Sequence, residues 1–369
     1  MQSLARNDYT AQQVEDVLHS ANVQQAFRYE LLDSQNKFKR QLDNVLTASV
    51  ANNALVDIKR TARFTLTEDG NIDFLSDRIK PWTKIKMPDG GFAEFPMGVF
   101  LLTTPPRKAN SVGIITREVE AYDQTQILLD DKVDDRYTVP AGTNYIAAIK
   151  DILDSAGITG QNLTPTDKVL PTDRDWDPGT TKLQIINDLL GAINYGSLYF
   201  DENGFAVAQP YVSPAIRASE YTYRDDDQSV MFPDVEQSLD LWNVPNKWVL
   251  SVSEADRAPL RSVYTNSNPD SPTSTVGRGR TIMADPIAVD AVDQTTLDAM
   301  VARRAYEASQ VYEKVSFGTG IMPMHSNADV LTLEFTGLGI SAKYAETSWE
   351  FELKAGARMK HEIRRVISI

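Results

Sequence analysis

The sequence contains no cysteine and only three histidines among its 369 residues. Without cysteine, the chain has no disulfides, no thiolate metal sites and no cysteine nucleophile. The N-terminal residues lack the apolar core of a signal peptide, and no apolar run approaches the length that spans a bilayer. We therefore expect no export by the standard route and no membrane insertion.

The common signatures of catalysis and nucleotide binding are absent too. The sequence holds no HExxH, no G-x-S-x-G, no Walker A loop and no G-x-G-x-x-G after a predicted strand. Acidic runs at residues 130–135 and 225–227 lack the spacing of a Ca²⁺ loop. Carboxylate pairs for glycoside hydrolysis cannot be selected among 51 acidic residues without geometry. We predict no catalytic residue, no cofactor and no metal ligand.

His325 and Asp329, four residues apart, are the strongest candidates for a metal or catalytic site. A zinc site needs three or four ligands in a fixed geometry. With so few histidines, a histidine-rich site requires His19, His325 and His361 to converge. The alternative, which we favour, is a polar turn over residues 323–328 that leads into a strand and leaves His325 exposed.

Acidic side chains outnumber basic ones by 51 to 37, which gives a formal net charge of −14. This sign disfavours general binding to nucleic acid, because such binding needs a basic surface for the phosphates. It suits a surface past which nucleic acid slides without sticking. It also serves plain solubility, which is the simpler interpretation.

Two segments differ strongly in charge. Residues 220–240 hold seven acidic residues and one arginine, whereas residues 354–365 hold five basic residues and one glutamate. The basic segment is either a docking edge for an acidic partner or a strand whose charges prevent aggregation. Opposite charges on two edges suit a head-to-tail contact. The candidate subunit-interface residues are Arg358, Lys360, Arg364, Arg365, Asp225, Asp226 and Asp227.

The first part of the chain is predicted to change from helix to strand. Residues 1–34 are expected to be a helical N-terminal segment, with Thr10 as the N-cap. Residues 35–140 are predicted to be mostly antiparallel β-structure. The alternation of apolar and polar side chains over residues 58–66 indicates a half-buried strand.

Three short segments predict β-hairpin turns. Residues 68–71 and 88–91 combine acidic residues with glycine between strand-like runs. Asn203-Gly204 predicts a type I′ turn, which needs positive φ at both central residues.

The middle of the chain, residues 141–212, is predicted to be a small α/β domain of two helices and a hairpin. Thr143 and Thr180 are expected to cap the two helices. Gly157 and Gly196 follow their expected ends.

The last part, residues 213–369, is predicted to be β-rich again. Residues 266–280 are rich in serine, threonine, proline and glycine, which predicts a long exposed loop. A helix is expected over residues 295–310. Clean alternation over 330–336 and 348–354 predicts two strands.

The most informative stretch is the helix–helix–hairpin order of segments 143–157, 176–196 and 198–204 between two β-rich parts. In this layout the chain resembles the tail hub proteins of bacteriophages, also called baseplate hub or tail-associated proteins, a minor tail protein family of long-tailed phages. The resemblance implies an α+β, mainly β fold. It implies two hub-type β-barrel tube domains, over residues 35–140 and 213–369, plus the small α/β domain.

The resemblance also implies a structural, non-enzymatic role. Family members are homotrimers whose two barrels per subunit form a pseudo-sixfold ring. Such a ring joins a hexameric tail tube to the tail tip or central fibre and lines the DNA channel. The implied partners are the distal tail or tail tube protein, the tape measure protein, the tail tip or central fibre protein, and genomic DNA that passes through without specific binding during ejection. The implied location is the tail tip of the virion, after assembly in the host cytoplasm.

An alternative class is a phage tail carbohydrate-binding or cell-wall-degrading protein. Five tryptophans and fourteen tyrosines could supply stacking surfaces for sugars. A cytoplasmic β-rich adaptor is a third class. The sequence stops soon after its last strand-like segment, so we expect host binding and wall cleavage to belong to other proteins.

Overall fold

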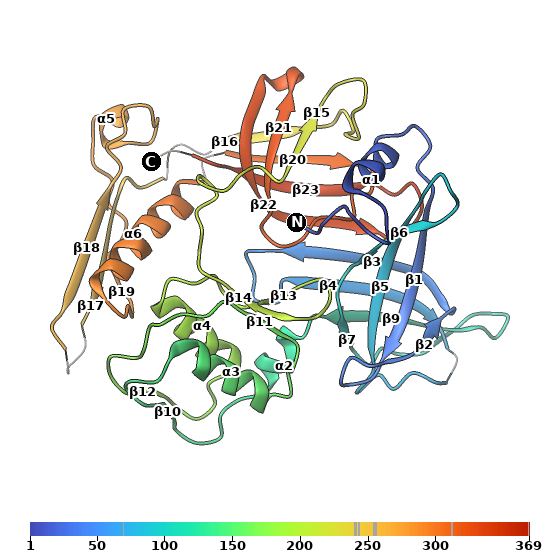
Figure 1. Cartoon of the computed structure of the whole chain (residues 1–369), viewed down its shortest axis with the longest axis horizontal. Helices are drawn as coiled ribbons and strands as arrows, with labels where there is room; N and C mark the ends of the chain where they lie inside the picture. The colour runs from blue at the N-terminus through green and yellow to red at the C-terminus, as the bar shows by residue number, and fades with distance from the viewer. Residues whose placement is uncertain (69, 240–241, 243, 254–256, 311–312, 368) are drawn as a thin grey trace.

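A computed structural model describes the chain except residues 69, 240–241, 243, 254–256, 311–312 and 368 (Figure 1). Asp69 of one predicted turn and Asp240 of the acidic segment lie outside the described residues. The fold is α+β and mainly β, as predicted, and consists of two β-rich halves, an α/β unit and a smaller inserted unit. Among the described residues, no helix has the length and apolar character needed to cross a membrane.

The first β half carries nine strands from the N-terminal third of the chain. They are β1 (Gln25–Leu32), β2 (Phe38–Leu42), β3 (Val45–Asn53), β4 (Arg60–Thr67), β5 (Arg78–Lys86), β6 (Phe92–Pro96), β7 (Phe100–Leu102), β8 (Lys108–Ala109) and β9 (Ile115–Tyr122). The strand order is β3-β4-β9-β7-β5-β1-β2, with β6 beside β5 and β8 beside β9. In β4, Ala62, Phe64 and Leu66 are buried, which confirms the predicted strand face.

The second β half combines strands from both sides of an insertion. They are β15 (Tyr221–Arg224), β16 (Glu236–Leu239), β20 (Glu313–Thr319), β21 (Val330–Phe335), β22 (Ile340–Glu352) and β23 (Met359–Arg365). Antiparallel pairing between β22 and β3 joins both halves into one sheet, for example at Ser348 with Asn53 and at Phe351 with Val50. Apolar side chains from both halves form one continuous core. The sequence did not predict this junction.

The α/β unit packs below the sheet in Figure 1 around its own core. Its elements are α2 (Thr125–Asp130), β10 (Tyr137–Val139), α3 (Tyr145–Ser155), β11 (Gln161–Leu163), β12 (Arg174–Trp176), α4 (Lys182–Ala192), β13 (Tyr199–Phe200) and β14 (Ala206–Ala208). Both predicted helices are present, but the N-caps are Asn144 and Thr181, one residue later than expected. Gly157 has the predicted positive φ, whereas Asn194, not Gly196, takes this conformation after α4.

A unit over residues 247–309 interrupts the second β half. Its elements are β17 (Lys247–Val252), β18 (Leu260–Thr265), α5 (Thr275–Arg278), β19 (Ile287–Ala288) and α6 (Gln294–Ser309). The helix α6 packs on β17 and β18 and confirms the helix predicted over 295–310. The predicted exposed loop over 266–280 is wrong in part, because Asn266 and Ser274 are fully buried and bond to neighbouring backbone and side chains.

The predicted helical segment over residues 1–34 is correct only for α1 (Ala11–Leu18), which Thr10 caps together with Gln13. Residues 25–32 form β1, which pairs with β5 along its whole length. The long antiparallel ladder with β5 outweighs any local helical preference.

The predicted turns have three outcomes. Residues 88–91 connect β5 to β6 as predicted, with Met87 and Gly91 bonded across the turn. Residues 68–71 do not form a hairpin, because the described strand pairs join β4 to β3 and β9 rather than to β5. Asn203-Gly204 does join two paired strands, but only Gly204 has positive φ, so the turn is not type I′.

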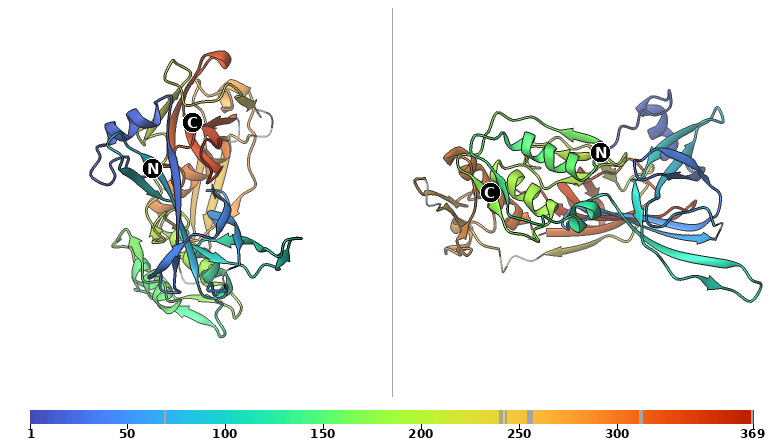
Figure 2. Two further views of the ribbon diagram at one scale, coloured as in Figure 1. Left: turned by 90° about the vertical axis from the view of Figure 1, so that its right-hand side faces the viewer. Right: turned by 90° about the horizontal axis from the view of Figure 1, so that it is seen from below.

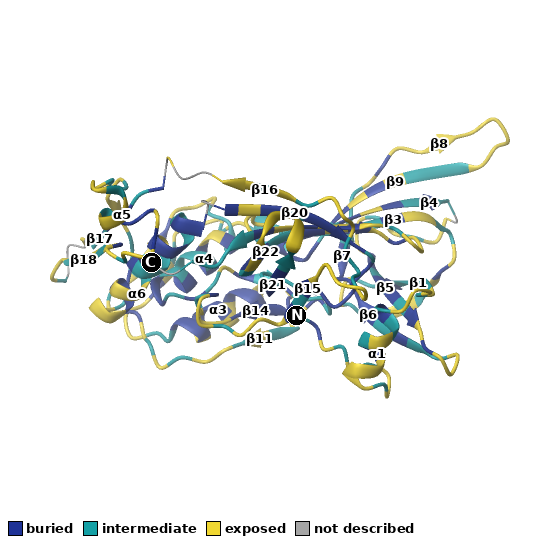
Figure 3. Cartoon of the chain, turned by 90° about the horizontal axis from the view of Figure 1, so that it is seen from above, coloured by how far each residue is buried: buried dark blue, intermediate teal, exposed yellow. Residues whose placement is uncertain are grey.

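The β8–β9 hairpin projects away from the body of the molecule (Figures 2 and 3). Its tip carries Val112 and Ile114, which are 76% and 48% exposed. Ion pairs hold its base: Arg107 and Arg117 contact Glu68. The tip therefore presents apolar side chains that no other part of the described chain covers.

Arg60, at the start of β4, is fully buried where three parts of the chain meet. Its guanidinium donates to the carbonyl oxygen of Met97 and to Ser326 Oγ, at 3.3 and 3.2 Å. It lies 3.7 Å from a Glu202 carboxylate oxygen and over the Trp349 ring. One cation thus contacts both β halves and the tip of the α/β unit.

We predict that Arg60→Met lowers the free energy of unfolding by about 3 kcal/mol, because it leaves buried acceptors and the Glu202 carboxylate without their cation. Arg63→Met is the matched control on the same strand, since Arg63 is 77% exposed and pairs with Glu120 only at the surface. The control should change the free energy of unfolding by less than about 1 kcal/mol. Urea denaturation followed by circular dichroism measures both, and equal effects would contradict the prediction.

Candidate functional sites: a buried ionic cluster and the predicted interface residues

His325 and Asp329 are buried, with 1% and 0% of their surface exposed, so the predicted exposed turn is wrong for His325. They lie in the segment between β20 and β21. The Asp329 carboxylate accepts a hydrogen bond from the Ser326 backbone N–H at 2.8 Å, which closes the turn and points both side chains inward. The turn exists, but its polar side chains face the core of the second β half.

Two further residues from neighbouring strands complete a buried ionic cluster of His325, Asp329, Glu346 and His361. Glu346 Oε2 lies 2.6 Å from His325 Nδ1, and Glu346 Oε1 lies 2.7 Å from His361 Nδ1. Asp329 Oδ2 is 3.4 Å from His325 Nδ1. All four side chains are almost completely buried.

The strands β22 and β23 explain how this cluster forms. The ladder between them is irregular after Glu346, where one extra residue of β22 enters the pairing. The irregularity allows Tyr344, Glu346 and Trp349 to face inward, although strict alternation would separate Trp349 from the other two. His361 lies between Met359 and Ile363 on the buried face of β23.

Hydroxyl groups hold the outer ring nitrogens of both histidines. Tyr223 OH lies 2.6 Å from His325 Nε2, and Thr319 Oγ1 lies 2.9 Å from His361 Nε2. The Phe317 ring stacks on His361 with the ring centroids 4.7 Å apart. The Met1 amino group contacts Asp329 Oδ1 at 2.7 Å. Each imidazole is therefore fixed in orientation.

Burial and charge act in opposite directions on these groups. Burial alone would lower the pKa of His325, but Glu346 and Asp329 outweigh it and raise that pKa to about 9. Burial would raise the pKa of Asp329, but His325 and the N-terminal amino group hold it well below its usual range. Burial lowers the pKa of His361, and burial with Glu346 raises the pKa of Tyr223.

The cluster can store charge or hold a cation. The ligand atoms of His325, Glu346 and His361 lie within 4.8 Å of one another. Each of the four residues is at most 2% exposed, and Glu346 borders the groove that Arg364 lines. The sequence did not predict that Glu346 belongs to the site. Glu346 follows Tyr344 by two residues in a strand, so both share one face, and this spacing was the signal that Glu346 faces the core.

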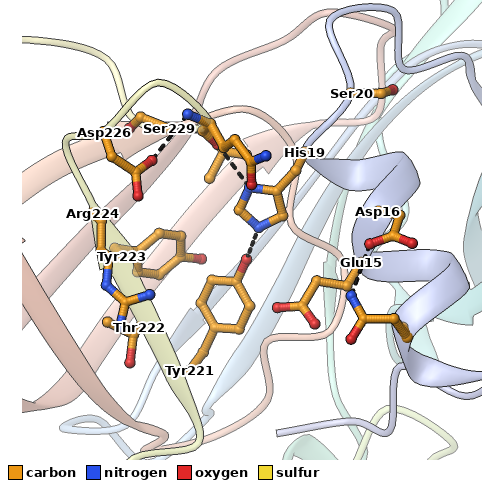
Figure 4. A pocket seen from close by; sticks show the side chains of 13 residues that line it. Glu15, Asp16, His19, Ser20, Tyr221, Thr222, Tyr223, Arg224, Asp226 and Ser229 are labelled. Carbon is orange, nitrogen blue, oxygen red and sulfur yellow. Dashed lines mark hydrogen bonds between the residues drawn. The ribbon is translucent and has the colours of Figure 1, made fainter.

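His19, the third histidine, does not join the other two. It ends α1, and its Nδ1 and Nε2 atoms lie 2.7 Å from the Gln228 carbonyl oxygen and 2.5 Å from Tyr221 OH (Figure 4). These contacts fix α1 beside the turn after β15. The hollow there has a volume of about 530 Å³, and acidic side chains including Glu15, Asp16 and Asp226 line it.

The predicted basic interface residues lie on or beside β23, and most are paired inside the chain. The ion pairs are Arg358–Asp234 at 2.6 Å, Lys360–Glu350 at 2.7 Å and Arg365–Glu313 at 3.0 Å. Arg364 is half-buried, and burial lowers its pKa. With Arg303 and Arg304 of α6, it lines a groove of about 680 Å³.

The predicted acidic interface residues share one exposed turn after β15. Asp225 accepts hydrogen bonds from the backbone N–H and the hydroxyl of Thr336. Asp226 accepts from the backbone N–H of Gln228, and Asp227 is exposed. β15 pairs with β21, whereas β23 lies between β20 and β22, so the acidic and basic groups occupy different strands of the second β half.

We predict that Arg365→Gln lowers the free energy of unfolding by about 2 kcal/mol. The reason is that Glu313, whose side chain is 2% exposed, loses its cation and keeps only its contacts with Tyr344 and Gln237. Lys360→Gln is the control, because both partners of its ion pair are exposed, and it should cost less than about 1 kcal/mol. Chemical denaturation of both variants checks this; a harmless Arg365→Gln would show that Glu313 needs no cation.

Comparison of sequences finds no protein-family model and no curated protein that matches the chain. Comparison of structures finds close matches over almost the whole chain. A tail protein from Neisseria meningitidis superposes with a TM-score of 0.65 at 12% identity and covers 92% of this chain and 97% of its own. The 43 kDa tail protein of prophage MuSo2 from Shewanella oneidensis gives 0.59 at 12% identity, with coverages of 92% and 98%.

A third match has the same character. The prophage tail protein gp18 from Listeria monocytogenes gives a TM-score of 0.53 at 12% identity and covers 92% of this chain and 95% of its own. The identities are low, so the comparison concerns the fold and not individual residues. The chain has the fold of these tail proteins, which confirms the resemblance to tail proteins that the layout of its sequence indicated.

Proposed function

We propose that this chain is a structural, non-enzymatic hub protein of a phage tail. In this role it forms a homotrimeric, pseudo-sixfold ring that joins the hexameric tail tube to the tail tip or central fibre. The observation that carries the proposal is the match of nearly the full chain to phage and prophage tail proteins.

The joined β halves support a ring of this symmetry. Each chain offers two β-rich halves in one continuous sheet, so three chains supply six such halves. A closed ring of identical chains requires head-to-tail contacts between two different surfaces of each chain. The separation of the acidic turn and the basic strand on each chain meets this requirement.

The net charge of −14 supports a role in lining the DNA channel. A negative surface repels phosphates and lets DNA pass during ejection without specific binding. The proposed partners are the distal tail or tail tube protein, the tape measure protein and the tail tip or central fibre protein. The proposed location is the tail tip of the virion, after assembly in the host cytoplasm.

For the subunit contact, we propose that the acidic turn Asp225–Asp227 of one protomer faces the basic groove of the next. Arg364 lines this groove together with Arg303 and Arg304. Arg358, Lys360 and Arg365 have partners within their own chain, so their contribution is a general positive field rather than new ion pairs. Arg364 and Asp227 are therefore the residues to test.

We predict that Arg364→Asp or Asp227→Arg shifts the trimer toward monomer, and that the double variant restores the trimer because opposite charges face each other again. Light scattering after size-exclusion chromatography, over a range of protein and salt concentrations, measures the mass. Lys150→Glu is the control, because Lys150 lies on the exposed side of α3, away from both groups. A monomeric wild-type chain at every concentration would refute the ring, and release of sugars from host wall would favour the enzymatic alternative.

We also propose that the β8–β9 hairpin contacts a neighbouring copy of the chain in the ring. An isolated two-stranded hairpin is marginally stable in water, and the apolar tip of this one has no cover within the described chain. We predict that Val112→Ser with Ile114→Ser leaves the unfolding of the monomer unchanged and weakens the trimer. Comparison of the unfolding midpoint with the trimer dissociation constant tests this, and loss of the fold or an unchanged trimer would contradict it.

A further inference from the structure

The buried ionic cluster has an arrangement that goes beyond a structural hydrogen-bond network. We propose that His325, His361, Glu346 and Asp329 form a closed four-ligand site for a divalent transition-metal ion, Zn²⁺ in particular. The inference concerns the interior of the second β half and stands independently of the proposed tail role. Its ligand set is two imidazole nitrogens and two carboxylate oxygens, which is a common chemistry for zinc.

The ligand atoms of His325, Glu346 and His361 lie within 4.8 Å of one another, with Asp329 beside His325, so the more distant of them must move closer together to hold a tetrahedral ion. Zinc binds nitrogen and oxygen at about 2.0 to 2.2 Å, which places neighbouring ligand atoms about 3.3 Å apart. His325 Nδ1 and Asp329 Oδ2 already lie 3.4 Å apart. The two contacts of Glu346, at 2.6 and 2.7 Å, must each open by roughly 0.6 Å, which is within the reach of a side-chain rotation.

Both histidines carry the outer hydrogen bonds that metal ligands need. A ligating imidazole almost always donates its other N–H to a fixed acceptor, which sets its tautomer and orientation. Here the Nε2 atoms face Tyr223 OH and Thr319 Oγ1, so both Nδ1 atoms are directed to the same point beside Glu346. Asp329 in turn accepts from Ser326 N–H, which fixes the second carboxylate.

The contacts of His361 give an independent reason for a cation. The single hydroxyl proton of Thr319 is donated to the Gly320 carbonyl oxygen at 2.6 Å, so His361 Nε2 must donate to Thr319. A neutral ring that donates from Nε2 has a lone pair and no proton on Nδ1. That position faces a carboxylate oxygen at 2.7 Å, and two acceptors repel unless a proton or a metal ion lies between them.

Charge and chemistry select the ion. The carboxylates of Glu346 and Asp329 supply two negative charges for a divalent cation, and the Met1 amino group, 2.7 Å from Asp329 Oδ1, adds one positive charge beside them. Imidazole ligands favour zinc and similar transition metals, whereas Ca²⁺ and Mg²⁺ prefer sites made of oxygen. Burial of all four ligand side chains is typical of structural zinc sites rather than catalytic ones, which keep an open position.

The first experiment measures metal in the wild-type chain. The full-length protein is stripped with a chelator, incubated with excess ZnCl₂, dialysed and examined by plasma mass spectrometry. We expect one zinc ion per chain, with a higher melting temperature than the stripped protein. A Co²⁺-loaded sample should show the visible absorption bands of tetrahedral cobalt.

The second experiment removes only the outer hydrogen bonds. Thr319→Val and Tyr223→Phe keep the shape of each side chain and delete the hydroxyl that holds a histidine. Each should weaken zinc affinity about 10- to 100-fold in a chelator competition. Tyr221→Phe is the matched control, because its hydroxyl contacts His19 outside the cluster, and it should leave the affinity unchanged.

Two results would overturn the proposal. The first is a stripped, folded wild-type chain that takes up no zinc from excess ZnCl₂; the cluster would then be held by a proton shared among its members. The second is zinc uptake that the Thr319 and Tyr223 variants leave unchanged, which would place the ion elsewhere. Histidine ring ¹⁵N shifts that change at His325 and His361 but not at His19 on adding zinc would support the site directly.

Discussion

A single buried cation ties the parts of this chain together. The guanidinium of Arg60 lies between the two β halves and the tip of the α/β unit, and it contacts a carbonyl oxygen, a hydroxyl, a carboxylate and an indole ring from four separate segments. A buried charge costs several kcal/mol unless an opposite charge and hydrogen bonds compensate for its lost hydration. The three parts must therefore meet in one arrangement for the charge to be tolerated, and the β3–β22 ladder fixes that arrangement through the backbone.

The two β halves have interiors of different chemistry. The first half fills its interior with apolar side chains such as Phe64, Phe95 and Phe100. The second half places two imidazoles and two carboxylates in its interior, beside Tyr223 and Phe317. Apolar side chains at this point would need no hydrogen-bond partners. Buried polar groups of this kind specify one packing only when each is satisfied. A cation at their centre, either a proton or a metal ion, meets that condition.

The resemblance to tail proteins rests on architecture. About one residue in eight is identical to the matched structures, yet more than nine-tenths of the chain superposes on them. The same order of β half, α/β unit and second β half is thus compatible with very different side chains. At such low identity the matches describe the fold, whereas function has to be argued from the site itself.

The sequence by itself determined the strands with strict alternation, such as β4 and β21, the helices of the middle segment, and the excess of negative charge. It also indicated the family layout. Only the tertiary structure decided that residues 25–32 are a strand, that residues 247–309 form their own unit, and that His325 is buried with His361 and Glu346. The reason is physical: periodicity reports which side of a local element is covered, whereas strand partners and polar clusters depend on residues hundreds of positions apart.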